Sequence, residues 1–95
     1  MEKRKGTIYI ISDGTGETAA TMIRAALVQY LDAEINIVRS KNVRTESQVE
    51  SVIADAFENQ GIIIHTVVSP QLKQVIQEQS AAKGLLSVDL IGPLL

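Results

Sequence analysis

Four short apolar runs alternate with three helix-periodic segments along this chain of 95 residues, and this alternation restricts its fold more than any other feature. The apolar runs cover residues 7–12, 34–39, 62–68 and 85–90, and a helical pattern fills each interval between them. Strands that alternate with helices form a parallel sheet with helices on both of its faces. The length suits one small domain, so we expect a single α/β domain over residues 1–95.

The composition of the runs predicts their places in the sheet. The run 62–68 consists almost entirely of β-branched residues and the run 7–12 is also apolar, which is typical of central strands covered on both faces. The run 34–39 alternates between apolar and polar residues, which favours an edge strand. These features predict a three-layer fold around a four-stranded parallel sheet of order 2-1-3-4, Rossmann-like or flavodoxin-like. Such sheets bind ligands at the carboxyl ends of the strands, near the switch point between strands one and three.

Each helix has a recognisable start. The first is expected over 17–31, the second after the capping box Thr45 to Gln48, and the third after Ser69 and Pro70. Gly61 and Gly84 are expected to end the second and third units. Apolar residues spaced three and four apart predict the buried faces. These are Ala19, Met22, Ile23, Ala26, Leu27 and Tyr30 in the first helix, Val49, Val52, Ile53, Ala56 and Phe57 in the second, and Leu72, Val75 and Ile76 in the third.

Composition limits the classes of partner. The net charge is -2, which provides no electrostatic case for nucleic acid. The chain has no cysteine, and its first apolar run is too short for a signal peptide or a membrane span, so we expect a cytoplasmic protein without a membrane contact. The apolar stretch 90–95 suggests part of a longer protein, and exposed strand edges make a homodimer plausible.

The segment 12–18 is the richest in chemistry. It joins the first strand to the first helix, and this position offers backbone N–H groups to an anion. It contains two carboxylates, three hydroxyls and two glycines but no lysine. These residues are Ser12, Asp13, Gly14, Thr15, Gly16, Glu17 and Thr18.

Known glycine-loop patterns fit this segment only in part. Residues 14–19 match G-x-G-x-x-A, but the end of strand two carries Arg39 where a dinucleotide site needs an acid, and Glu34 stands at the strand start. Residues 15–18 resemble part of a flavodoxin-like loop, yet Asp13 and Glu17 would repel a phosphate dianion. The Walker pattern G-x-x-x-x-G-K-[ST] is absent from the sequence. NAD and FMN sites are therefore the less favoured alternatives.

A purely structural role also explains part of the segment. Asp13 or Thr15 could cap the first helix, and Glu17 could interact with its dipole. Caps do not account for so many polar residues in a row.

Other polar residues should lie on the same edge. Arg39, Lys41 and Arg44 form either an anion clamp or a solvated loop, with the solvated loop favoured. Thr66 and Asp89 also end strands there. For His65, the only histidine, we favour a buried neutral imidazole with a backbone partner over a catalytic role.

Five motifs in order resemble one family. They are Ile-Ile-Ser-Asp-Gly-Thr-Gly-Glu-Thr-Ala at 10–19, Ala-Leu-Val-Gln-Tyr at 26–30, Val-Arg-Thr at 43–45, His-Thr-Val-Val-Ser-Pro at 65–70 and Val-Asp-Leu-Ile-Gly-Pro-Leu-Leu at 88–95. The chain resembles the N-terminal part of the bacterial regulatory proteins of pyruvate, phosphate dikinase and phosphoenolpyruvate synthase.

The resemblance implies a bifunctional Ser/Thr kinase and pyrophosphorylase. Such a protein phosphorylates a threonine of the dikinase or synthase with ADP as donor, and removes the phosphoryl group with inorganic phosphate, releasing pyrophosphate. It also implies that the nucleotide, together with Mg²⁺, binds a P-loop in a later part that is missing here, so these 95 residues alone are expected to be inactive and to hold no tightly bound cofactor.

Within these residues we predict the rim of a composite site. Asp13 and Glu17 are the candidates for a supporting catalytic role, and no metal ligands are predicted. Residues expected to contact substrate or phosphate are Ser12, Gly14, Thr15, Gly16, Thr18, Arg39 and Arg44. The alternative is a module that recognises the target protein without catalytic residues, and less favoured is a small nucleotide- or flavin-binding domain.

Overall fold

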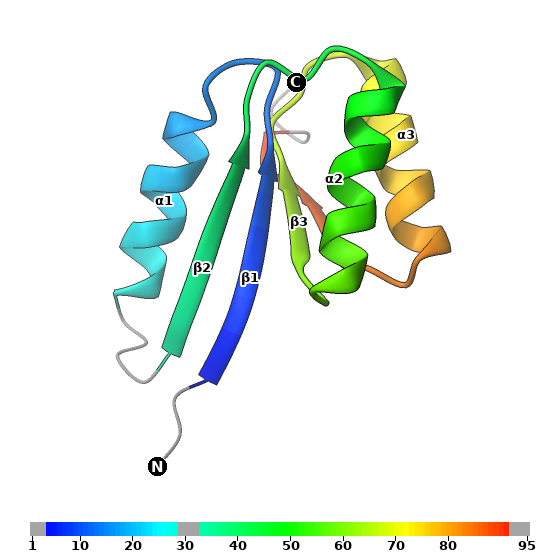
Figure 1. Cartoon of the computed structure of the whole chain (residues 1–95). Helices are drawn as coiled ribbons and strands as arrows, with labels where there is room; N and C mark the ends of the chain where they lie inside the picture. The colour runs from blue at the N-terminus through cyan, green and yellow to red at the C-terminus, as the bar shows by residue number, and fades with distance from the viewer. Residues whose placement is uncertain (1–3, 29–32, 92–95) are drawn as a thin grey trace.

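The computed structural model describes residues 4–28 and 33–91, which form four strands and three helices (Figure 1). The strands make one parallel sheet of order β2-β1-β3-β4. The predicted α/β class, the strand order and the edge position of the second strand are therefore confirmed. The elements are β1 (Arg4–Ile11), α1 (Glu17–Leu27), β2 (Ala33–Ser40), α2 (Glu46–Glu58), β3 (Ile62–His65), α3 (Pro70–Ala82) and β4 (Ser87–Asp89).

The third strand is shorter than the β-branched run predicts. It ends at His65, although the Thr66 N–H still donates to the Ile11 carbonyl at 3.0 Å. Two residues later the Val68 N–H donates instead to the Asp13 carboxylate, at 3.0 Å. The chain thus leaves the sheet before Val68, and the expected strand 62–68 is wrong at its carboxyl end. The fourth strand, expected over 85–90, is likewise limited to Ser87–Asp89.

Helices cover both faces of the sheet. Figure 1 shows α1 at the β2 end, on the opposite side of the sheet from α2 and α3. Alternate residues of each strand point to opposite faces, so β1 sends Ile10 toward α1 and both Tyr9 and Ile11 toward α2 and α3. The larger core lies on the α2–α3 side and consists of Tyr9, Ile11, Val43, Val49, Ile53, Ala56, Ile63, Val67, Leu72 and Ile76.

The predicted helix starts are confirmed. Thr45 and Gln48 form a reciprocal capping box before α2. The Ser69 hydroxyl accepts from the Leu72 N–H at 3.3 Å, and Pro70 is the first residue of α3. After α3, Gly84 adopts a positive φ of 70°, which favours glycine.

Three positions expected on the buried helix faces lie outside. Met22 is 52% exposed, Ala26 is exposed, and Phe57 is 50% exposed. In α1 the buried residues are the expected Ala19 and Ile23 together with Ala20. The Phe57 ring lies under the Lys83 ammonium, 5.0 Å from the ring centroid. The prediction for Tyr30 falls outside the described residues.

None of the helices in residues 4–28 and 33–91 is long and apolar enough to cross a membrane.

Candidate functional site

A cavity of about 400 Å³ lies at the carboxyl ends of β1 and β3, where the strand order reverses. This is the place where parallel sheets bind ligands. The segment 12–18 forms most of its wall, and one side is apolar. Its lining residues are Ser12, Asp13, Gly14, Thr15, Gly16, Glu17, Thr18, Ala19, Met22, Thr66, Leu90 and Ile91.

Two of the three hydroxyls in this segment bond to the segment itself. The Ser12 hydroxyl accepts from the Gly14 N–H at 3.0 Å, and the Thr15 hydroxyl accepts from the Glu17 N–H at 3.2 Å. Thr15 therefore satisfies one of the N–H groups that a helix start leaves without an intrahelical partner. The N-cap of α1 is Gly16, which has no capping side chain, so the expectation that Asp13 or Thr15 is the N-cap is wrong. The Ser12 and Thr15 side chains shape the loop before the helix.

Gly16 adopts the left-handed conformation, with φ of 73°. A Cβ atom at this position would lie 3.4 Å from Ile10 Cγ2, so glycine permits both the turn and the close packing of the loop on β1.

Asp13 fastens three loops together. Its carboxylate accepts from the Val68 N–H, and its carbonyl accepts from the Arg44 guanidinium. Val68 belongs to the connection before α3, and Arg44 to the connection before α2. Asp13 thus positions the rim of the cavity, and it does not cap α1.

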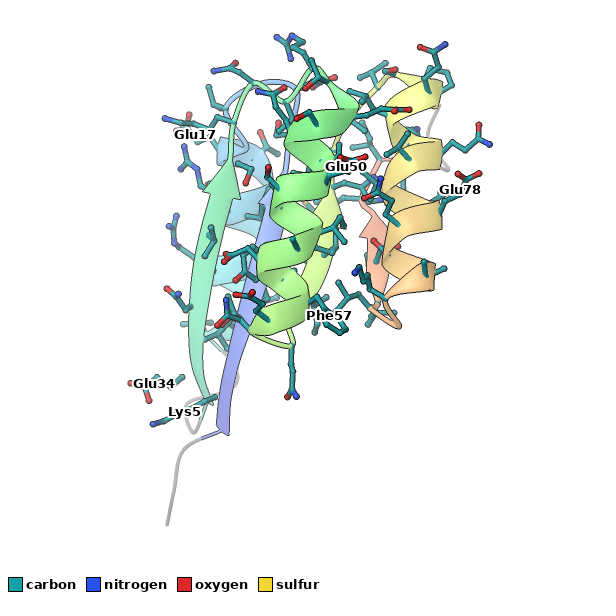
Figure 2. All side chains as sticks on the ribbon, turned by 45° about the vertical axis from the view of Figure 1, so that its right-hand side comes forward. Lys5, Glu17, Glu34, Glu50, Phe57 and Glu78 are labelled. Atoms are coloured by element: carbon teal, nitrogen blue, oxygen red, sulfur yellow. The ribbon has the colours of Figure 1, made fainter. Side chains whose placement is uncertain are left out.

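Thr15, Glu17 and Thr18 are exposed at this rim, and Glu17 and Thr18 lie on the first turn of α1. Figure 2 shows Glu17 at the opposite end of the sheet from Glu34 and Lys5. Glu34 therefore cannot supply the acid of a dinucleotide site at this cavity, as its place at the strand start indicates. Glu17 is the carboxylate best placed to reach a bound molecule.

The basic residues do not gather at the cavity. Arg39 is exposed on β2, with its Cγ 4.0 Å from the place of a Cβ on Gly16, and Lys41 is exposed in the following loop. Arg44 lines a separate hollow of about 510 Å³ between α2 and α3, together with Ser69 and Glu78. Neither arginine nor Lys41 is among the residues that line the 400 Å³ cavity.

A second polar cluster lies beneath α3. Lys73 Nζ is 3.4 Å from the Asp89 carboxylate, and both are close enough to His65 to influence its protonation. Burial lowers the pKa of His65, the nearby Asp89 opposes this change, and Lys73 adds to it. The pKa of Asp89 is lowered although burial alone would raise it, because the Ile91 N–H and Lys73 bind the carboxylate.

His65 is 1% exposed, as expected, and its lowered pKa favours the neutral ring. Its Nδ1 has no hydrogen-bond partner among the described residues, so the expected backbone partner is not found there. Lys73 was not anticipated from the sequence, since nothing in a helical pattern indicates which charge will lie under a neighbouring strand.

Within residues 4–28 and 33–91, no group of three or more histidine, aspartate or glutamate side chains is arranged to hold a metal ion.

The family model described as Kinase/pyrophosphorylase matches residues 8–95. The chain belongs to this kinase/pyrophosphorylase family. Curated relatives carry the name "Putative pyruvate, phosphate dikinase regulatory protein". One from Bdellovibrio bacteriovorus is 57% identical over 94% of this chain, and one from Geobacter metallireducens is 41% identical over 93%. One from Geobacter sulfurreducens is 36% identical over the whole chain.

These findings confirm the resemblance deduced from the motifs. The chain spans about a third of the length of these relatives, 32%, 33% and 35% respectively. The family match covers most of this domain, from residue 8 onward.

Proposed function

We propose that the full-length protein containing this domain is a cytoplasmic regulator of pyruvate, phosphate dikinase or phosphoenolpyruvate synthase. It transfers a phosphoryl group from ADP to a threonine of the target, and it removes that group with inorganic phosphate, forming pyrophosphate. The observation that carries this proposal is the family match over residues 8–95, together with the names of the relatives.

The domain described here supplies a rim of the site and does not hold the nucleotide by itself. It has no G-x-x-x-x-G-K-[ST] pattern, and Asp13 and Glu17 place negative charge beside the helix start that would otherwise receive phosphate. We place the ADP and Mg²⁺ sites in the remaining two thirds of the family protein.

The contacts divide the rim residues into two roles. The side chains of Ser12, Asp13 and Thr15 bond to the loops and hold them in position. Glu17 and Thr18 are exposed beside the cavity, where a carboxylate and a hydroxyl can accept and donate hydrogen bonds to an incoming threonine segment. Glu17 and Thr18 are therefore the contact residues in this proposal, and Asp13 is a positioning residue.

The test measures both reactions with the full-length protein: ADP-dependent phosphorylation of each candidate target, and phosphate-dependent release of pyrophosphate. Glu17→Gln removes the charge at the rim, and Glu34→Gln is the matched control at the other end of the sheet. We expect Glu17→Gln to lower both rates by about tenfold, which corresponds to about 1.4 kcal/mol and is typical for the loss of one hydrogen bond. Glu34→Gln should leave both rates unchanged. Equal rates for all three proteins would remove the rim from the mechanism. Failure of ADP to support phosphorylation by the unaltered protein would reject the proposed reaction itself.

The second candidate is recognition of the target protein without any part in the chemistry. The apolar wall formed by Met22, Leu90 and Ile91 favours it, because an apolar wall beside polar groups suits a peptide segment. Weaker binding of the target by Glu17→Gln, with an unchanged single-turnover rate at saturating target, would support recognition. A large thermal shift of the 95-residue domain with ADP would contradict our placement of the nucleotide elsewhere.

A further inference from the structure

Half of one sheet face is apolar and uncovered. On β3 and β4, Ile62 is 38% exposed and Val88 is 39% exposed, and Leu86, which directly precedes β4, is 62% exposed. Ile64 is paired in register with Val88, and Ile64 packs against the α1 core, so these alternate positions face the α1 side of the sheet. The apolar strip therefore lies beside α1 and on the same face.

The alternate residue of β3, which faces the other side of the sheet, differs in its burial. Ile63 is completely buried beneath α2 and α3, whereas Ile62, the preceding residue on the same strand, is not. α2 packs on β1 and β3 and α3 packs on β4, whereas Figure 1 shows α1 at the β2 end of the opposite face. Within residues 4–28 and 33–91, the α1 cluster reaches Ile64, but no helix covers Ile62, Leu86 and Val88 on this side of the sheet.

We propose that this strip, comprising Ile62, Ile64, Leu86 and Val88, is the docking site of one amphipathic helix from the part of the family protein that these 95 residues do not span. The curated relatives are about three times as long as this chain, so ample sequence is available to supply it. Neighbouring strands are about 4.8 Å apart and a helix is about 10 Å wide, so two strands accommodate one helix.

The topology indicates where in the longer chain this helix belongs. The order β2-β1-β3-β4 and right-handed crossovers place α2 and α3 on one face, because both lead the chain in the same direction across the sheet. A crossover from β4 to a further strand beyond it would continue in that direction and place its helix on the α2–α3 face. The helix on the strip therefore belongs to a connection that leads the chain back toward β2, because a right-handed crossover in that direction lies on the α1 side.

A second copy of this domain fits the strip less well. A stable interface buries about 800 Å² from each partner, which is about 20 residues or more a side. The strip offers four apolar side chains, of which only Val88 is on the three-residue strand β4. A strip this narrow matches a single helix in the same polypeptide, which needs no intermolecular binding energy.

The absence of cysteine from these residues gives a direct test in the full-length protein. Cysteines elsewhere in the protein are replaced by serine, and Val88→Cys is compared with Glu78→Cys on the exposed side of α3. The rate of reaction with a soluble thiol reagent is divided by the rate in denaturant. We expect Val88→Cys to be protected at least tenfold more than Glu78→Cys, because a docked helix must open before the reagent enters.

Equal protection of the two cysteines would overturn the proposal. Protection of Val88→Cys that disappears on dilution would overturn it in favour of a second copy. A photo-crosslinker in place of Leu86 gives an independent measurement: we expect a crosslink within one polypeptide to a segment beyond residue 95, and crosslinks only between polypeptides would contradict us. Neither measurement depends on phosphoryl transfer, so the proposed activity can fail while the docking site stands.

Discussion

The two faces of the sheet differ in how completely they are covered. On the α2–α3 side, ten buried residues form one cluster, whereas the α1 side has a cluster of four, counted over residues 4–28 and 33–91. The strand β3 is equally apolar on both sides, since Ile62, Ile63 and Ile64 follow one another along it. The composition of a strand shows that both of its faces are apolar. Whether both faces are buried depends on how many helices pack on each side of the sheet.

The largest expected effect compares two neighbouring isoleucines on opposite faces. Ile63→Ala should lower the free energy of unfolding by about 2–5 kcal/mol, because it leaves a cavity in the covered core. In the 95-residue domain by itself, where no further helix can dock on the strip, Ile62→Ala should cost less than about 1 kcal/mol, since that side chain is partly in water. Urea denaturation of the two variants measures both values. Similar costs would mean that the two faces are equally covered in solution; Ile63→Val serves if the alanine variant does not fold.

A second comparison uses one glycine from each side. A Cβ on Gly61 would lie 2.6 Å from the Tyr9 ring in the larger core, so Gly61→Ala should cost about 1–3 kcal/mol through overpacking. Gly16→Ala meets only ordinary contacts but requires the left-handed conformation, and should cost about 1–2 kcal/mol. Thermal unfolding of both variants tests the ranking, and a larger loss for Gly16→Ala would mean that the left-handed conformation costs more than the overpacking against Tyr9.

The third prediction concerns the loops above both faces. Asp13→Ala removes the acceptor for the Val68 N–H and should lower stability by about 1 kcal/mol. Asp13→Asn keeps an oxygen acceptor and should recover most of that loss. Denaturation curves of the two variants separate hydrogen bonding from charge. If Asn is as harmful as Ala, the charge of Asp13 rather than its hydrogen bond holds the rim.

The smallest expected effect is a change of stability with pH, caused by a residue on the α2–α3 face. His65 has a lowered pKa in the folded protein, chiefly through burial, so the unfolded chain binds its proton more readily. Stability should therefore decrease as the pH falls below about 6.5, the ordinary histidine value. Asp89, whose folded pKa is lowered, stabilises the protein above its ordinary value of 3.8 and loses this contribution only at lower pH.

Urea denaturation between pH 7.5 and pH 5 measures the histidine contribution, with His65→Gln as the control. His65 is the only histidine, so His65→Gln should remove most of the slope near pH 6. If the free energy of unfolding of His65→Gln still changes with pH near pH 6, groups other than His65 cause the pH dependence.

Much of the fold could be predicted because it depends on local patterns. The apolar runs predicted the four strands, and their composition predicted which strands are central. The capping box at Thr45 and the Ser69–Pro70 pair marked helix starts correctly, since a cap involves residues only three positions apart. The end of β3 could not be predicted in this way, because it depends on a hydrogen bond between Asp13 and Val68, which are 55 residues apart.

The candidate site was predictable as a location and less so as a set of roles. The segment 12–18 does line the cavity at the switch point, as its position between strand and helix indicates. Arg39 and Arg44 do not line that cavity. Arg39 is on the edge strand and Arg44 is in a loop, and the sequence does not indicate which way such exposed side chains point. The partner of each hydroxyl likewise depends on loop geometry that spacing does not encode.

By itself, then, the sequence determined the layers, the order of the strands and the edge of the sheet that carries the polar segment, since these follow from hydrophobic periodicity and the handedness of crossovers. Only the tertiary structure decided that Phe57 and Met22 lie outside, that Lys73 and Asp89 lie beside His65, and that one half of a sheet face remains apolar and open. The physical reason is that periodicity reports which side of an element is apolar, whereas packing depends on which other elements reach that side.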